Sequence, residues 1–449
     1  MKFLRNKQIF VCFFVFLFYL INIKIVFADI SNSLEYYKEN LYSDSVLMIN
    51  QDTDTIIVEK NPDKHRSPAS LTKILTFIVE REKLQNQDLN TKIIVKEEVL
   101  KFVDPDSSGV KLKVGEEVSI DTLEKSMLIS SSGYAAMVLA DYAGGNVENF
   151  VNLMNGKLVE LGCENTHFVN PDGIYHENQY STARDMYKIC KYAMNIPGFL
   201  DIVSQSECDL FNDNRDPVVT TNSMIDIKRG GKYYCPWVKG IKTGYTSESG
   251  RCLISYAVNK NVNQSYVTVA MGAPVVDQNN EKIRDNLAMI DTLNLYNWAF
   301  NNLKIITVYY PDIPVTDTNL NYVFGTDKLL LYPAQEIKVI VPKNITKENL
   351  SLTYDIPDNI NAPVHKNNKI GTAHIIYNNK ILQEFDLISA DNFKKSNILV
   401  CYKFVKTIIT HPIFITIFII ILSGIGLYVS MILKQNRKDK YKNKVKYWK

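Results

Sequence analysis

The segment Pro412 to Leu433 constrains this chain most, because its 22 consecutive residues include no charged side chain. A helix of that length, rising 1.5 Å per residue, would be about 33 Å long and could cross the hydrocarbon core of a bilayer. The last 16 residues follow at once with eight Lys or Arg and one Asp. Since basic flanks stay in the cytoplasm, we expect a single-pass membrane helix at 412–433, a cytoplasmic tail at 434–449 and an extracellular remainder.

The N-terminus has the layout of a secretory signal peptide. A short basic start precedes an apolar run from Ile9 to Phe27, and the small residue Ala28 follows the run. This layout predicts cleavage after Ala28, so that residues 1–28 are removed. An uncleaved anchor helix is the alternative. Both ends of the chain therefore place the intervening residues on the outer face of the cell membrane.

The intervening residues have a net charge of −8, although the whole chain carries +3. A nucleic-acid-binding protein would be expected to have the opposite sign in its folded part, so we expect no nucleic-acid partner. The seven cysteines and six histidines show neither C-x-x-C nor paired-ligand spacing. No metal and no cofactor is therefore expected.

Residues 29–302 are predicted to form one α+β domain with an antiparallel sheet and a helical subdomain. Apolar periodicity predicts a hairpin from Val46 and a helix from about Ser70. The remaining elements expected in this domain are strands at 110–114, 238–242, 251–258 and 266–270, and helices at 123–142, 147–161, 181–192 and 280–300. The third of these helices begins at Thr182, which is well placed as its N-cap.

The sequence changes character after residue 302. Residues 303–395 show almost no helical periodicity and contain short apolar runs separated by Pro, Asn and Gly. This pattern predicts a small all-β domain, followed by a linker at 396–411 and then the membrane helix. The domain could be a spacer that lifts the first domain away from the membrane, or a module that binds a partner.

Two short motifs contain side chains that could carry out catalysis. The first is Ser70-Leu71-Thr72-Lys73. An S-x-x-K pattern should occur by chance about twice in a chain of this length, and residues 108–111 match it too. Only the first match opens a predicted helix, where residues i and i+3 share a face and Lys73 can reach Ser70. A desolvated lysine can take the proton of a serine and make it a nucleophile. Alone, Ser70 could equally be a simple helix cap.

The second motif is Lys242-Thr243-Gly244, at the end of a predicted strand. Lys242 would offer a cation to a substrate carboxylate, and Gly244 would let a substrate backbone approach the strand edge. A hairpin with a surface lysine is the alternative explanation.

Together with Phe168–Gly173 and Ser181–Met186, these motifs resemble the low-molecular-mass penicillin-binding proteins, which are serine D-alanyl-D-alanine carboxypeptidases. The resemblance covers roughly residues 35 to 300 and extends more loosely to the β domain and the anchor. It implies a β-lactamase/transpeptidase-like catalytic domain that acts on the stem peptides of peptidoglycan and is inhibited covalently by β-lactams.

The resemblance also implies roles for individual residues. Ser70 would attack the carbonyl between two D-alanines, with Lys73 as general base, to give an acyl-enzyme that water then hydrolyses. The amides of Ser70 and Tyr245 would form the oxyanion hole. Lys242 and Thr243 would hold the terminal carboxylate, and the charge of Lys242 would help to keep Lys73 unprotonated.

The third motif of the family, S-x-N, is where this sequence departs from the pattern. Its serine aligns with Ser131, which could pass a proton to the leaving amine, but Gly133 occupies the asparagine position. The asparagine would hydrogen-bond the substrate amide, and losing such a bond costs about 1.5–3 kcal/mol. The register is open by one residue, because Ser130 and Ser132 flank Ser131.

Two other functions stay open from the sequence. The missing asparagine allows a degenerate protein that binds penicillin or cell-wall peptide without turnover. A class A-like β-lactamase shares S-x-x-K and K-T-G, but Glu164 and Glu177 are not in a recognisable deacylation loop. The carboxypeptidase is the favoured prediction.

Overall fold

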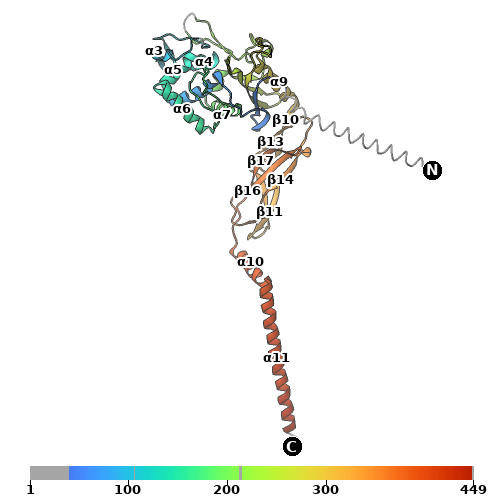
Figure 1. The fold of residues 1–449 in the computed structure, drawn as a ribbon. Coiled ribbons are helices and arrows are strands. Elements are labelled where there is room, and N and C mark those ends of the chain that lie inside the picture. The colour runs from blue at the N-terminus through green and yellow to red at the C-terminus, as the bar shows by residue number, and fades with distance from the viewer. Residues whose placement is uncertain (1–39, 106, 212–214, 447–449) are drawn as a thin grey trace, which may run out of the picture. The chain divides into compact units, whose positions relative to one another are not determined.

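The computed structural model describes residues 40–105, 107–211 and 215–446, so the predicted signal peptide at 1–28 lies outside the described residues. The chain divides into two compact units (Figure 1). The first contains the described residues up to Ile305 together with Ile340–Ile345, and the second contains Ile306–Val339 and the chain from Thr346 onward.

A five-stranded antiparallel sheet forms the centre of the first unit, in the order β2-β1-β9-β8-β7. Its strands are β1 (Ser45–Asn50), β2 (Thr55–Lys60), β7 (Val238–Thr246), β8 (Gly250–Asn259) and β9 (Gln264–Ala273). The predicted antiparallel sheet and the hairpin from Val46 are thus confirmed. Strand β7 is at one edge of the sheet.

The sheet is covered on both faces. Since side chains alternate along a strand, Leu47 and Ile49 of β1 enter one hydrophobic core, while Val46 and Met48 enter another. The first core is shared with α2 (Lys73–Lys83), α3 (Glu97–Leu100), α4 (Ile120–Ile129), α5 (Gly133–Gly144), α6 (Val147–Glu160), α7 (Ala183–Met194) and α8 (Phe199–Val203). The second is shared with α9 (Leu287–Asn302). This arrangement is the predicted α+β catalytic fold with a helical subdomain.

Several short elements complete the first unit: η1 (Ala69–Thr72), β3 (Lys92–Ile94), β4 (Glu117–Ser119), β5 (Glu207–Cys208), β6 (Val218–Val219) and η2 (Gly231–Tyr233). The helix predicted from Ser70 begins with the single turn η1 and continues as α2. The helices predicted at 147–161 and 181–192 are confirmed as α6 and α7, and Thr182 caps α7 by accepting a hydrogen bond from the Asp185 amide. Helix α9 starts later than predicted, because Asn286 caps it.

The prediction of one helix over 123–142 is wrong. The chain forms α4 and α5, separated by Ser130–Ser132. Ser131 has a left-handed backbone with φ 68°, and the Ser132 hydroxyl accepts a hydrogen bond from the Ala135 amide as the N-cap of α5. Both helices bury apolar residues, so the hydrophobic pattern runs through the break and hides it.

The strand predicted at 110–114 is also wrong. The Val110 amide donates to the Ser130 hydroxyl over 3.4 Å, and the Val110 carbonyl accepts from the Ser132 hydroxyl. Backbone groups that a strand would pair with a neighbouring strand are thus taken by side chains of the α4–α5 junction. The alternation of the sequence around Leu112 reflects one buried residue between exposed ones.

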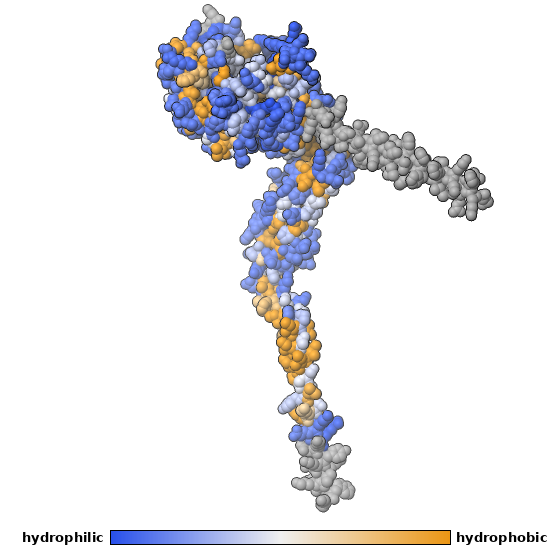
Figure 2. All heavy atoms as spheres, in the orientation of Figure 1, coloured by the Kyte–Doolittle hydropathy of each residue, from blue (hydrophilic) through white to orange (hydrophobic). Residues whose placement is uncertain are grey.

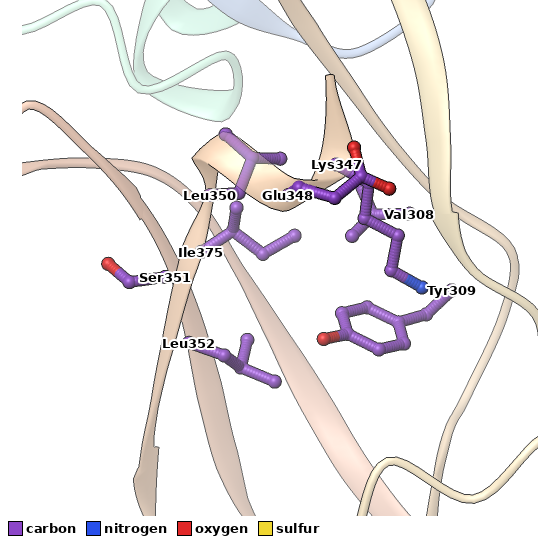
Figure 3. Close-up of a pocket in the computed structure, with 8 residues that line it drawn as sticks. All are labelled: Val308, Tyr309, Lys347, Glu348, Leu350, Ser351, Leu352 and Ile375. Carbon is purple, nitrogen blue, oxygen red and sulfur yellow. The ribbon is translucent and has the colours of Figure 1, made fainter. Parts of the chain in front are cut away.

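The second unit is built from strands, as the sequence predicts for residues after 302. A six-stranded sheet has the order β14-β16-β17-β12-β11-β15. The elements of this part of the chain are β10 (Leu303–Tyr309), β11 (Thr316–Asn321), β12 (Lys328–Pro333), β13 (Ile337–Pro342), η3 (Lys347–Asn349), β14 (Ser351–Asp355), β15 (Asn359–Asn361), β16 (Lys369–Tyr377) and β17 (Lys380–Ser389). A hollow of about 320 Å³ in this unit is lined by aliphatic and polar side chains beside Tyr309 (Figure 3).

Two helices end the described chain. Residues 396–411, treated above as a linker, contain α10 (Asn397–Thr410), and α11 spans Pro412–Lys446. The segment Pro412–Arg437 of α11 is long and apolar enough to cross a membrane. Figure 2 shows hydrophobic residues gathered along this helix, with hydrophilic residues following toward its C-terminal end.

Candidate active site

Ser70 and Lys73 are brought together by the turn that opens α2. Lys73 Nζ donates a hydrogen bond to Ser70 Oγ over 3.1 Å, and the Lys73 side chain is buried. Ala69, immediately before the serine, has a left-handed backbone with φ 48°, and its carbonyl accepts a hydrogen bond from the Thr72 hydroxyl over 2.8 Å. Strained residues of this kind persist only where surrounding contacts hold them, and they cluster at functional sites.

The second partner of Lys73 comes from the loop at 168–173. Lys73 Nζ donates to the backbone carbonyl of Asp172, and the Thr76 hydroxyl donates to the carbonyl of Pro171 over 2.6 Å. Gln179 fixes the same loop, because its side-chain oxygen accepts from the amides of Val169 and Asn170 over 2.9 and 3.0 Å. The loop thus directs one carbonyl at the lysine. Its sequence was noted above, but Asp172 was given no role.

Gly173 lets this loop lie directly against the nucleophile's turn. Its backbone has φ 83°, and an added Cβ would lie 2.1 Å from the carbonyl oxygen of Ala69 and 3.0 Å from the amide nitrogen of Ser70. Neither the conformation nor the space suits another residue. Glycine at this position is therefore required by packing against Ser70.

The K-T-G motif lies within strand β7, which continues to Thr246 instead of ending at Lys242 as predicted. A Cβ added to Gly244 would lie 3.0 Å from the Pro68 carbonyl oxygen and 3.3 Å from the Ser70 amide nitrogen. The strand edge therefore passes beside the turn that carries Ser70. Gly244, predicted to let a substrate approach the strand edge, also packs closely against that turn.

Lys242 is buried, and its Nζ donates to the carbonyl of Thr243 over 3.0 Å. Burial lowers the pKa of Lys73 to about 8, although the Asp172 carboxylate raises it. Burial also lowers the pKa of Lys242 well below its usual value, and the charge of Lys73 lowers that pKa further. We expected the charge of Lys242 to act on Lys73. Because repulsion acts on both groups, the pair resists holding two protons.

Thr243 has a partner that the sequence analysis missed. The hydroxyls of Thr221 and Thr243 lie 2.5 Å apart, and the Thr221 amide donates to the carbonyl of Ile129 at the end of α4. Thr221 thus connects the K-T-G strand with the α4–α5 junction. It follows the two-residue strand β6, which is too short to give a periodic signal.

Ser131 lies in the α4–α5 junction, buried, with the left-handed backbone noted above. Among the described residues, no hydrogen bond joins its hydroxyl to Ser70 or Lys73. The junction nevertheless reaches the Lys73 environment, because an added Cβ on Gly133 would lie 3.3 Å from Oδ2 of Asp172.

Tyr245 is the most exposed of the predicted site residues, with 57% of its surface accessible. The guanidinium of Arg251 lies over its ring, 5.7 Å from the ring centroid. Among the described residues, no group of three or more His, Cys, Asp or Glu side chains is arranged to hold a metal ion. The site therefore offers a serine, a lysine of lowered pKa, a second buried lysine and several hydroxyls, which together suit acyl transfer through a covalent serine ester.

Known proteins match this chain in both units. A family model described as D-alanyl-D-alanine carboxypeptidase matches residues 32–275, and the model of the penicillin-binding protein 5 C-terminal domain matches residues 312–395. The D-alanyl-D-alanine carboxypeptidase DacF of Bacillus subtilis is 28% identical over 80% of this chain and 88% of its own length. DacC of Escherichia coli is 29% identical over 76% of this chain and 81% of its own length.

A solved structure agrees with these sequence matches. Penicillin-binding protein 5 from Haemophilus influenzae superposes with a TM-score of 0.66 and 25% identity. The match covers 79% of this chain and 98% of that structure. The similarity therefore extends over the catalytic fold and the β domain together.

Proposed function

Because the chain belongs to the D-alanyl-D-alanine carboxypeptidase family and is a serine-type D-Ala-D-Ala carboxypeptidase of the cell wall, we propose that Ser70 forms its acyl-enzyme. The observation that supports this assignment best is the 3.1 Å hydrogen bond from Lys73 Nζ to Ser70 Oγ at the start of α2. A serine becomes a nucleophile when an adjacent base takes its proton, and a buried lysine with a pKa of about 8 can do so.

The first half of the reaction is acylation. Ser70 Oγ attacks the carbonyl carbon between the two terminal D-alanines of a stem pentapeptide, and Lys73 Nζ accepts the hydroxyl proton. The amides of Ser70 and Tyr245 stabilise the oxyanion of the tetrahedral intermediate. The carbon–nitrogen bond then breaks, and Ser131 passes its hydroxyl proton to the leaving amine while it takes the proton held by Lys73. D-alanine departs, and Lys73 is neutral again.

The second half is hydrolysis of the ester. Lys73 takes a proton from water, and the resulting hydroxide attacks the ester carbonyl. The carbon–Oγ bond then breaks, and Lys73 returns the proton to Oγ, which restores Ser70. A β-lactam follows the same first half, but its ring nitrogen stays attached to the acyl group. Such drugs would therefore inhibit the protein covalently.

Lys242 and Thr243 bind the terminal carboxylate in this proposal. An approaching carboxylate favours a protonated Lys242, which opposes the effect of burial on its pKa. A protonated Lys242 in turn favours a neutral Lys73, the form needed as base. Substrate binding would thus favour a protonated Lys242 and a neutral Lys73, which is the state that catalysis requires.

The full chain, purified in detergent, tests the role of Ser70. We expect it to release D-alanine from a stem pentapeptide that ends in D-Ala-D-Ala, and we expect a Ser70→Ala variant with an unchanged melting temperature to release none. A fluorescent penicillin should label only the unaltered protein. Unchanged release or labelling in the Ser70→Ala variant would show that another residue is the nucleophile.

We also propose the membrane arrangement of the chain. One apolar helix, Pro412–Arg437, can anchor the protein. Its basic C-terminal tail favours a cytoplasmic end, so that the catalytic domain faces the cell wall where the substrate is located. The domain limits expected from the sequence, 29–302 and 303–395, are kept as part of this proposal.

A further inference from the structure

A second loop, formed by residues 107–110, is attached to the α4–α5 junction. Val110 makes two hydrogen bonds with serine hydroxyls of the junction, as described above. An added Cβ on Gly109 would lie 2.5 Å from the Ser130 carbonyl oxygen and 2.6 Å from the Ser132 amide nitrogen. The two loops are therefore in direct backbone contact. The position of Ser107 relative to the junction is thus set by several contacts.

Ser107 occupies the space that a side chain at position 133 would fill. An ideal Cβ on Gly133 would lie 2.0 Å from Ser107 Oγ and 3.1 Å from Ser107 Cβ. A side chain at 133 would force the Ser107 hydroxyl to turn away and would still lie tightly against Ser107 Cβ. Gly133 begins α5 with a φ that other residues could adopt, so space rather than backbone conformation explains the glycine.

The hydroxyl of Ser107 lies on the same side of Gly133 as Asp172, the residue whose carbonyl binds the proposed catalytic lysine. The same ideal Cβ position is 3.3 Å from Oδ2 of Asp172, and the Asp172 carbonyl accepts the hydrogen bond of Lys73. Asp172 is buried, whereas Ser107 is half-buried and can meet solvent or substrate. Among the hydrogen bonds of the described residues, none uses the Ser107 hydroxyl, although its amide donates to the Asp104 carbonyl.

We propose that Ser107 is a substrate-binding residue whose hydroxyl bonds the amide on the acyl side of the attacked carbonyl. This inference rests on the proposed function of Ser70 and Lys73. The carboxylate end of the substrate already has Lys242 and Thr243, while Ser107 belongs to the side of the site that carries Asp172. A hydroxyl can donate to an amide oxygen or accept from an amide nitrogen, and a peptide substrate carries both groups there.

Two β-lactams separate this contact from a general structural effect. Penicillin G carries an acyl-side amide, whereas 6-aminopenicillanic acid has a free amine at the same place. In the full chain in detergent, Ser107→Ala should slow acylation by penicillin G about tenfold and acylation by 6-aminopenicillanic acid much less. Ser108→Ala is the matched control, because Ser108 is the exposed neighbour in the same loop and should leave both rates unchanged.

The outcomes decide between roles. Equal slowing with both compounds would overturn substrate contact, because it would mean that Ser107 acts through the protein. Unchanged rates with both compounds would overturn the proposal as well. If the unaltered protein is labelled by neither compound and releases no D-alanine, the function assigned to the site has failed, and the role of Ser107 fails with it.

A reciprocal exchange tests the steric part of the inference without relying on catalysis. Gly133→Asn alone should lower the melting temperature, because its Cβ would overlap Ser107 Oγ. Combining it with Ser107→Gly should restore the melting temperature. Effects of the two substitutions that simply add in the melting temperature would contradict the pairing of residues 107 and 133.

Discussion

At the scale of single residues, Lys73 illustrates how burial prepares a group for chemistry. Its pKa falls to about 8 because the ammonium is desolvated, and the nearby Asp172 carboxylate limits the fall. An ordinary lysine, with a pKa of 10.5, would be almost fully protonated at neutral pH. A buried lysine leaves a useful fraction of neutral amine. Lys242 is also buried, and repulsion between the two ammonium groups lowers its pKa further.

The pH dependence of acylation follows from this lowered pKa. Only neutral Lys73 accepts a proton, so the rate of penicillin acylation should rise about tenfold per pH unit below pH 8 and level off above it. The midpoint belongs to the coupled Lys73–Lys242 pair and is read from a stopped-flow pH–rate profile. A flat profile between pH 6 and about 9 would contradict a lysine base.

The same shift affects stability in a defined direction. Between about pH 8 and 10.5 the unfolded chain binds more protons at Lys73 than the folded chain does. The contribution of this residue to the free energy of unfolding should therefore increase with pH across that window and stay constant below it. Denaturant titrations of the unaltered protein and of a Lys73→Met variant should differ in this pH dependence.

Gly173 is a second residue for which the structure makes a sharp prediction. Gly173→Ala combines an unfavourable φ with a Cβ only 2.1 Å from the Ala69 carbonyl oxygen, so the turn that carries Ser70 has to move. We expect a loss of about 1–3 kcal/mol in the free energy of unfolding and at least tenfold slower penicillin acylation.

Gly115→Ala is the matched control for that substitution. Gly115 has a similar φ of 80°, but an added Cβ would meet no atom within 4 Å. It should lose some stability from backbone strain and keep its acylation rate. Equal acylation rates in the two variants would contradict the idea that Gly173 holds the Ser70 turn in place.

At the scale of elements, the break between α4 and α5 shapes the site most. It presents three consecutive serines, and the Ser132 hydroxyl both caps α5 and holds the 107–110 loop through Val110. One continuous helix would have turned these groups away from the loop. The Thr221 amide also donates a hydrogen bond to the carbonyl of Ile129 at this junction. The α4–α5 junction thus contacts both the 107–110 loop and Thr221.

Two helix caps provide a test of this interpretation. Ser119 caps α4 and Ser132 caps α5, and each accepts an amide hydrogen bond over 3.2 Å. Replacing either serine with alanine should cost about 1 kcal/mol of unfolding free energy, measured in denaturant. Only Ser132→Ala should also slow acylation, because only Ser132 contacts the 107–110 loop. Equal slowing in both variants would contradict a special role for the junction.

At the scale of the whole molecule, the two terminal helices form an apolar segment suited to anchor the protein in a membrane. Helix α11 is apolar over Pro412–Arg437, and α10 before it exposes large apolar residues such as Ile398 and Phe404. No residue in the apolar window of α11 is buried. A water-soluble protein would rarely leave so large an apolar surface uncovered. A lipid environment accounts for it.

Shortening the chain tests the anchor. A protein that begins at Asp29 and stops at His411 should leave the membrane fraction, whereas one that begins at Asp29 and keeps α11 should remain there after a carbonate wash. Penicillin labelling of both forms shows whether the catalytic domain is folded. Retention of the shortened, labelled form in the washed membranes would mean that α10 or another surface is sufficient for anchoring.

Features that depend on neighbours along the chain could be predicted before the fold was known. The uncharged length of residues 412–433, the period-two strands and the three-residue spacing of Ser70 and Lys73 are local, so their structures follow from local geometry. Two local patterns gave wrong predictions. The apolar stripe of the helices hid the break at Ser130–Ser132. The alternation at 110–114 predicted a strand, but the backbone groups of Val110 bond to serine hydroxyls.

The rest of the site could be recognised only in the folded chain, because it depends on residues far apart in sequence. Lys73 donates a hydrogen bond to the carbonyl of Asp172, which is 99 residues away in the sequence. Gly244 packs against Pro68, and Ser107 fills the space beside Gly133. The lowered pKa of Lys73 likewise arises from burial by several segments at once. Such contacts leave no periodic trace in a single sequence, since each is made by one residue at one place in a packed fold.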